Sequence, residues 1–211
     1  MTQNIALFPL QLVVFPGETL NLHIFEPRYR QLVDDAEKGG INFCVPTVIN
    51  GKIHPIATEV ELKEIAMRYP GGESDIHCLG KTVFHLEDIW KNYPEKLYPG
   101  GSGHPLTVDP QEDPVINQEI ITITTEIYRL LNIDKAIRSI EEGFATYDIS
   151  HYVGMTLEQE YELLTLLNGK ERQLFLLDHL RTISPSIERK TAIRDRAKLN
   201  GHFQELTPPE W

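Results

Sequence analysis

Hydrophobic and polar positions divide the chain into a first half rich in strands and a second half rich in helices. Between residues 19 and 24 every second position is apolar, a period of two that indicates a half-buried strand. Short apolar runs at 5–7 and 12–15 precede it. Pro16-Gly17 follows these runs and predicts a type II turn, because proline fixes φ and glycine supplies a positive φ.

The period changes after Glu26. Pro27 is suited to the first position of a helix, where its missing N–H would have no partner. Gly39-Gly40 is a stop signal. Apolar residues recur between them at the spacing of one helix face: Tyr29, Leu32, Val33 and Ala36.

Strand patterns return at 42–49, 59–67 and 76–89, and Asn50-Gly51 predicts a tight hairpin turn. In the last of these strands we expect a bulge at Gly80. Four apolar side chains of this strand are expected on one face: Ile76, Cys78, Phe84 and Leu86. Residues 93–110 are rich in Pro, Gly, Ser and Tyr and are interpreted as a long loop or linker.

Helical signals dominate from Asp113, an N-cap candidate followed by Pro114. The apolar stripe expected there comprises Ile116, Ile120, Ile123, Ile127 and Leu131. Thr156 and Gln159 predict a capping box for a helix over 157–167. Two further helices are expected, 171–182 and 186–199, separated by a break at Ser184-Pro185.

The predicted fold class is therefore α+β, with a barrel or sandwich in 1–112, a helical part in 113–205 and a tail in 206–211. Residues 168–200 contain eight basic and four acidic residues, a balance of +4, although the whole chain carries −11. We interpret the basic segment as a solvated helix surface, with steering of a partner as the alternative.

Composition narrows the classes of function. A net charge of −11 argues against nucleic acid as a partner, because proteins that bind it need basic groups to replace phosphate counterions. No apolar run is long enough to span a bilayer, and the N-terminus lacks the basic start of a signal peptide. We expect a cytoplasmic protein in which Cys44 and Cys78 are reduced and buried.

Motifs for catalysis are incomplete. Gly80-Lys81-Thr82 lacks the earlier glycine of a phosphate loop, since position 75 is Asp. Ser102 lies in a glycine-rich segment that resembles a nucleophile elbow, but His104 stands where the last glycine should be. The histidines show no metal-binding spacing, and neighbouring acids such as Asp34-Asp35 are interpreted as solvated surface. We expect no catalytic residue, metal or cofactor.

Three segments near the N-terminus carry a family resemblance. Leu7–Leu10, Val14–Glu18 and Leu22–Arg30 together resemble the opening of the Lon protease N-terminal (substrate-binding) domain. The strand at 80–84 and the helical segment 157–180 are more loosely similar to the family. The residues of the signature itself are Phe8, Pro9, Phe15, Pro16, Gly17, Phe25, Glu26, Pro27, Arg28 and Tyr29.

The resemblance implies a PUA-like β-pseudobarrel with a helical bundle, in which the signature residues mainly build the fold. Arg28 is expected to pair with a nearby acid. Full Lon proteases continue into ATPase and peptidase modules. This chain has neither their motifs nor the length for them, so we expect a stand-alone domain from which only the binding function carries over.

The resulting hypothesis is a non-catalytic module that binds unfolded or exposed polypeptide segments, or an adaptor to a protease or chaperone. The alternative is a PUA-like RNA-binding protein. Aromatic side chains provide large contact areas at low entropic cost, although packing over the barrel ends is an equally good interpretation of them. The candidate contact residues are Tyr69, Trp90, Tyr93 and Tyr98. The oligomeric state and the identity of the bound polypeptides stay open.

Overall fold

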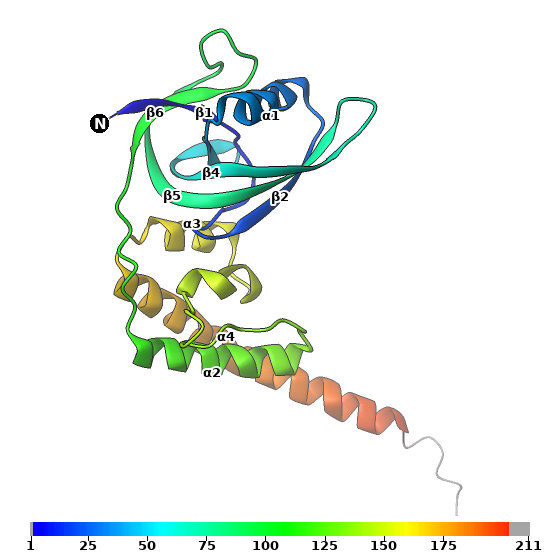
Figure 1. Cartoon of the computed structure of the whole chain (residues 1–211). Coiled ribbons are helices and arrows are strands. Elements are labelled where there is room, and N and C mark those ends of the chain that lie inside the picture. Colours follow the sequence, from blue (N-terminus) through cyan, green and yellow to red (C-terminus); the bar gives the residue numbers. More distant parts are fainter. Residues whose placement is uncertain (1, 203–211) are drawn as a thin grey trace, which may run out of the picture. The chain divides into compact units, whose positions relative to one another are not determined.

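The structure, a computed structural model, describes residues 2–202, with side chains described as far as residue 194 (Figure 1). The chain divides into two compact units. Within the described residues, the first unit comprises 2–111 and 154–172, and the second comprises 112–153 and 173–202.

The first unit contains a six-stranded sheet that closes on itself. The strands follow the order β2-β5-β4-β3-β1-β6, and a further pairing between β5 and β6 completes a barrel. The β1–β3 pair is parallel and the other pairs are antiparallel. The strands are β1 (Gln3–Leu7), β2 (Thr19–Ile24), β3 (Phe43–Ile49), β4 (Lys52–Arg68), β5 (Ser74–Trp90) and β6 (Gly100–Pro105).

Two apolar clusters lie on opposite faces of the barrel wall, as the alternation along β1 shows. Ala6 belongs to a large cluster shared with α1 (Pro27–Gly39), and its neighbours Ile5 and Leu7 belong to a smaller one. The smaller cluster also contains Cys44, Ala57, Phe84 and Leu86. The strand at β1 is thus buried on both faces, which explains its continuous apolar sequence.

The expectation of one apolar face along β5 is wrong. Ile76 and Cys78 lie in the large cluster, whereas Phe84 and Leu86 lie in the small one. The cause is the bulge expected beside Gly80: the β4–β5 register shifts there, because Val60 pairs with Gly80 while its neighbour Glu59 pairs with Thr82. One extra residue reverses the face to which the following side chains point.

The expectation that 93–110 is one long loop is also wrong, because β6 lies within it. Its sequence, Gly-Gly-Ser-Gly-His-Pro, has no alternation of apolar and polar residues. The strand instead forms through pairing with β1 on one side and β5 on the other. A Cβ atom at Gly101 would lie 2.5 Å from the Asp88 carbonyl oxygen, so the glycines allow this close approach.

Helix α1 forms as its sequence predicts. Pro27 occupies its first turn, and Gly40 ends it in the left-handed conformation, with its N–H bonded to the Ala36 carbonyl. The expected apolar stripe is buried: Tyr29, Leu32, Val33 and Ala36. The type II turn is also present, since Gly17 has φ 84° and the Glu18 N–H bonds to the Phe15 carbonyl.

The remaining helices are α2 (Pro114–Leu131), the short 3₁₀ helix η1 (Thr146–Tyr152), α3 (Leu157–Thr165) and α4 (Gly169–His202). Asp113 caps α2, and Thr156 and Gln159 form the predicted capping box of α3. The stripe of α2 is rotated from the expected one, with Leu131 44% exposed. The buried residues are Asn117, Ile120, Thr124, Ile127 and Tyr128.

Polar contacts explain this rotation in the second unit. The Gln173 side chain accepts a bond from the Asp113 N–H and donates to the Asn117 side chain, so a buried asparagine has a matched partner. Burying polar groups costs little free energy when they are hydrogen-bonded in this way. A pattern of apolar residues in the sequence does not reveal such positions.

The predicted break at Ser184-Pro185 is absent, because α4 continues through Pro185 to His202. A proline removes one backbone hydrogen bond, here to the carbonyl of Arg181. Arg181 is exposed, so water can bond that carbonyl and the helix tolerates the loss. The expected separate helix 186–199 is therefore the second part of α4, and the expected tail 206–211 lies outside the described residues.

Residues 154–172 group with the barrel, although the sequence assigned them to the helical part. Two contacts within the first unit explain this grouping. The Tyr161 hydroxyl accepts a bond from the Ile56 N–H of β4, and Arg172 donates to the Asp109 carbonyl. Within residues 2–202, none of the helices combines the length and the apolar character needed to cross a membrane.

Candidate functional site

Helix α1 has two polar flanks beside its buried stripe, and each flank holds a different part of the first unit. Gln31 and Asp35 contact the segment that follows β5, and Arg30 and Asp34 contact the β4–β5 hairpin. Because residues four apart lie on the same side of a helix, this division follows directly from the sequence positions. The two flanks define two candidate surfaces.

On the first flank, hydrogen bonds and an ion pair connect the segment 91–98 to α1. The Leu97 N–H donates to the Gln31 side chain at 2.7 Å. The Asp35 carboxylate accepts a bond from the Tyr98 hydroxyl at 2.8 Å and pairs with the Lys96 ammonium group at 2.8 Å. Asp35, which the sequence suggested to be solvated surface, therefore positions a loop.

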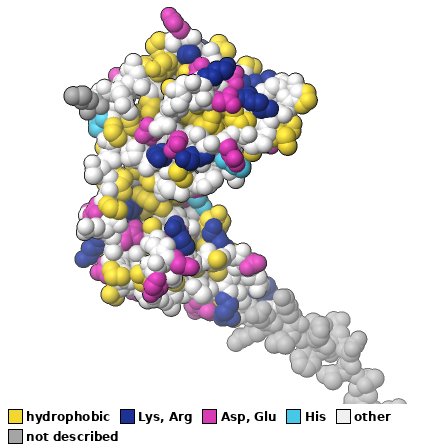
Figure 2. Space-filling model, viewed as in Figure 1, with side chains coloured by type: hydrophobic (Ala, Val, Ile, Leu, Met, Phe, Trp, Pro, Cys, Tyr) yellow, Lys and Arg dark blue, Asp and Glu magenta, His cyan; other side chains and the backbone are white. Residues whose placement is uncertain are grey.

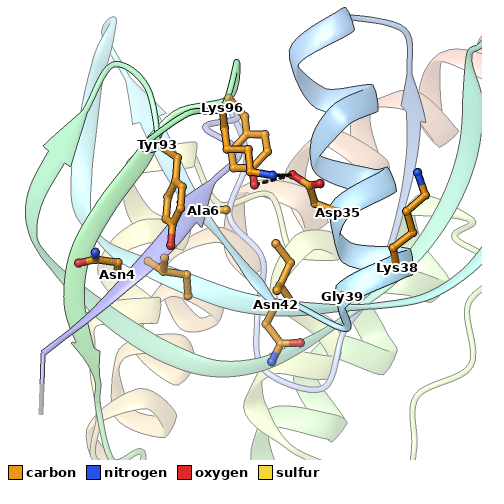
Figure 3. A pocket seen from close by; sticks show the side chains of 11 residues that line it. Asn4, Ala6, Asp35, Lys38, Gly39, Asn42, Tyr93 and Lys96 are labelled. Carbon is orange, nitrogen blue, oxygen red and sulfur yellow. Dashed lines mark hydrogen bonds and ion pairs between the residues drawn. The ribbon is translucent and has the colours of Figure 1, made fainter.

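A pocket of about 450 Å³ opens beside this contact. Figure 3 shows Lys96 and Tyr93 on one side, Asp35 on α1 opposite them, and Asn4 and Asn42 at the edge. Its remaining lining residues are Ile5, Ala6, Lys38, Gly39, Ile41 and Tyr98. The lining thus combines apolar side chains with an ion pair and two amides, and a concave pocket with convergent polar groups is a candidate binding site.

The pKa of Asp35 is set by opposing effects. Desolvation acts to raise it, but hydrogen bonds from Lys96 and Tyr98, together with the charges of Lys96 and Lys38, outweigh this and hold the pKa below its ordinary value. The pKa of the Tyr98 hydroxyl is raised, first by desolvation and then by the bond to Asp35. Around neutral pH, Asp35 is therefore a carboxylate and Tyr98 a neutral phenol.

This pKa shift predicts how acid affects the first unit. A carboxyl group whose folded pKa is depressed contributes stability above its unfolded pKa, and the contribution is lost as pH falls toward the folded value. Asp35→Asn should lower the free energy of unfolding by about 1 kcal/mol at neutral pH. The difference from wild type should shrink as pH falls below the unfolded pKa of the carboxyl group. Urea unfolding at neutral pH and near pH 3 measures this, and a difference independent of pH would contradict it.

The expected contact residues near this pocket have different environments. Tyr93 is half-buried and lines the pocket, and Trp90 lies next to it with ring centroids 6.5 Å apart. Tyr98 is 1% exposed and belongs to the large core cluster. Its ring is closed to any partner, so its role is to position the loop through Asp35.

The second flank holds the β4–β5 hairpin. Arg30 donates to the Gly71 carbonyl and pairs with Glu73, and Arg68 pairs with Glu37 and Asp34. Apolar side chains gather at the free end of this hairpin, at the right of the barrel in Figure 2.

Exposed aromatic side chains lie near this hairpin in a defined arrangement. The Asp75 carboxylate accepts a bond from the Tyr69 hydroxyl at 2.7 Å and lies 2.6 Å from the His23 ring nitrogen. The His23 ring is 5.7 Å from the Tyr69 ring and 6.2 Å from the Phe25 ring. Tyr69 is 40% and Phe25 59% exposed, so neither ring is closed into the core. We call Phe25, His23 and Tyr69 the aromatic surface.

Phe25 was expected to have a mainly structural role as a signature residue, but its side chain points to solvent. The other aromatic signature residues are buried: Phe15 is fully enclosed, and Phe8 contacts Tyr29 with centroids 3.9 Å apart and the rings tilted. Arg28 pairs with Glu26 at 2.8 Å, as expected. Pro16 and Gly17 form the turn before β2, Pro27 lies at the start of α1, and Pro9 lies just after β1.

The side chains considered for catalysis do not form a catalytic arrangement with one another. Ser102 lies on β6 and bonds to Asp88, and His104 pairs with Glu87 instead of with the serine. Within the described part of the chain, no three His, Cys, Asp or Glu side chains are grouped to hold a metal ion. Burial raises the pKa of the Cys78 thiol to about 12, which is the opposite of what a nucleophilic cysteine needs.

The chain thus has an α+β fold, with a pocket beside α1 and exposed aromatic side chains near the β4–β5 hairpin. A family model for the substrate-binding domain of ATP-dependent protease La (LON) matches residues 4–182. The chain belongs to this family, as the N-terminal motifs predicted.

Two solved structures have the same fold. The Lon N-terminal domain protein from Xanthomonas campestris is 22% identical, with a TM-score of 0.64 and an alignment that covers 83% of this chain and 98% of that one. The N-terminal domain of the Mycobacterium avium complex Lon protease is 15% identical, with a TM-score of 0.59 and coverages of 85% and 98%. No curated protein matches the chain. The α+β prediction is confirmed.

Proposed function

We propose that this domain binds exposed apolar segments of polypeptides destined for proteolysis, and that the pocket beside α1 accepts one apolar side chain of the bound segment. The pocket itself carries the proposal: Tyr93 forms one wall, and Ile41, 39% exposed, offers an apolar surface that the fold leaves uncovered. Membership in a family of substrate-binding domains supports the same role.

The chemistry of the pocket fits a short stretch of polypeptide. Tyr93, Ile5 and Ile41 can contact an apolar side chain, and the amides of Asn4 and Asn42 at the edge can bond to main-chain groups. Burying one Leu-sized side chain yields about 1.5–3 kcal/mol. One pocket therefore gives weak binding on its own, and affinity for a long unfolded chain would come from repeated encounters along it.

A matched pair of variants tests the pocket. Ile41→Ser removes an apolar wall, whereas Leu97→Ser changes a side chain of the adjacent loop that is 57% exposed and does not line the pocket. In fluorescence anisotropy titrations with a labelled, permanently unfolded protein, Ile41→Ser should weaken binding by roughly fivefold to tenfold. Leu97→Ser should bind as the wild type does.

Equal affinity of both variants would remove the pocket from the binding site. Saturable binding that survives added salt is expected for apolar contact. A steep loss of affinity with salt, seen with RNA and not with the unfolded protein, would instead favour the RNA-binding alternative. Binding to neither would mean that the domain acts as an adaptor through a folded protease or chaperone partner.

A further inference from the structure

Strand β2 lies at an unprotected edge of the sheet. Among the described strands it pairs only with β5, so one side of its backbone has no strand neighbour. Proteins usually protect such edges with charged residues or proline, because an open edge attracts other chains. The sequence of β2, Thr-Leu-Asn-Leu-His-Ile, contains no proline and no lysine, arginine or acidic residue.

The hydrogen-bond pattern shows which backbone groups face the open edge. The Gly80 N–H donates to the Glu18 carbonyl, and these two residues continue the β2–β5 register. In an antiparallel pair, residues that exchange hydrogen bonds alternate with residues that do not. Leu20, Leu22 and Ile24 therefore bond to β5. The N–H and C=O groups of Thr19, Asn21 and His23 point away from it.

The aromatic surface lies at one end of this edge. His23 belongs to β2, and Phe25 follows directly after it. The contacts of His23 and Tyr69 with Asp75 hold two of these rings in place. Ordered and exposed aromatic rings beside an open strand edge provide the two parts of strand addition: main-chain hydrogen bonds for affinity and side-chain contacts for selection.

We propose that an extended segment of a substrate polypeptide pairs with β2 as an added strand and places an apolar side chain on the aromatic surface. This inference rests on the proposed function, since the ligand is again a polypeptide, but it uses a surface on the other flank of α1. The chemistry selects a segment of about five or six residues with alternating apolar side chains.

Charge determines which polypeptide fits. The acids beside β2 already have partners, since Glu26 pairs with Arg28 and Asp75 contacts His23 and Tyr69. The whole chain nevertheless carries a net charge of −11. A segment with neutral or basic flanks is therefore favoured over an acidic one. A second copy of this chain is disfavoured, because two copies each carrying −11 repel one another.

Two matched peptides test the inference without changing the protein. One is a labelled peptide with alternating valine and threonine between lysines, and the other is the same peptide with alternate amides N-methylated, which blocks pairing along one edge. The full chain should bind the N-methylated peptide at least roughly tenfold more weakly, as measured by anisotropy. Equal binding of the two peptides would overturn the inference.

Protein variants then locate the contact. Phe25→Ser should weaken binding of the unmodified peptide, whereas Val115→Ser, exposed on α2, should leave it unchanged. Thr19→Lys places a charge at the open edge and should also weaken binding of the unmodified peptide. Circular dichroism checks that each variant is folded. If sedimentation shows a wild-type dimer that Thr19→Lys dissociates, the occupant is a second copy and the inference is wrong.

The same measurements separate this inference from the proposed function. If the unfolded protein binds through Ile41 while N-methylation has no effect, only strand addition fails. If the unmodified peptide binds through Phe25 while Ile41→Ser leaves the unfolded protein's affinity unchanged, only the pocket fails. Binding of neither ligand rejects both.

Discussion

Replacing Gly103 by alanine should lower the free energy of unfolding by about 3 kcal/mol. Gly103 lies in β6, where the strand approaches β5 closely to complete the barrel. A Cβ atom there would lie 2.0 Å from the His85 carbonyl oxygen and 2.8 Å from the Phe84 ring. Both distances are far below van der Waals contact, and backbone atoms cannot move aside as a flexible side chain can. The strands must therefore separate locally.

Chemical denaturation of the variant and of Gly39→Ala measures this effect. Gly39 ends α1, and a Cβ atom added there would meet only Ile41, at an ordinary 3.6 Å. Alanine is the better helix former, so Gly39→Ala should be neutral or slightly stabilising. A Gly103→Ala protein as stable as wild type would show that β6 does not close the barrel as described.

Replacing Arg172 by alanine should cost about 3 kcal/mol or more. Its side chain is 2% exposed, and it donates to the carbonyls of Leu166 and Leu167, just after α3, and of Asp109. Removing the guanidinium leaves these three carbonyls without that donor inside the first unit. Arg172→Lys should also be destabilised, since one ammonium group cannot reproduce the planar geometry of two donating nitrogens.

The control is Arg181→Ala on the same helix. Arg181 pairs with Glu119, but both side chains are largely exposed, and such pairs contribute at most about 1 kcal/mol. Thermal and urea unfolding of the two alanine variants should therefore differ clearly. If both variants lost the same stability, burial of Arg172 would not be the origin of its effect.

The sequence predicted those elements whose caps and apolar period lie close together in the chain. Helix α1 begins at Pro27, buries the expected stripe and stops beside Gly40, because its caps and its amphipathic period all lie within the fifteen residues from Glu26 to Gly40. Strand β6 could not be found in this way. Its glycines have no side-chain pattern, and only the nearness of β1 and β5, distant in sequence, makes that segment a strand.

The candidate site was predictable in part. Tyr93 and Tyr69 were predicted because aromatic residues in loops or beside turns offer large contact areas, and in the structure Tyr69 is 40% exposed and Tyr93 is half-buried. Tyr98 was assigned to the same group, although a hydrogen bond to Asp35, 63 residues earlier, places it in the core. Phe25 was regarded as structural because a motif does not reveal the direction in which a side chain points. These distinctions depend on tertiary contacts that no local pattern contains.

Hydrogen exchange with and without a bound unfolded polypeptide tests the central claim most directly, because it reports the location of binding for each segment. If the domain binds polypeptides at the pocket, amides in 38–42 and 93–97 should exchange more slowly in the complex, and strand addition would extend the protection to β2. Protection confined to α2 in the second unit, or none anywhere under saturating ligand, would contradict the account.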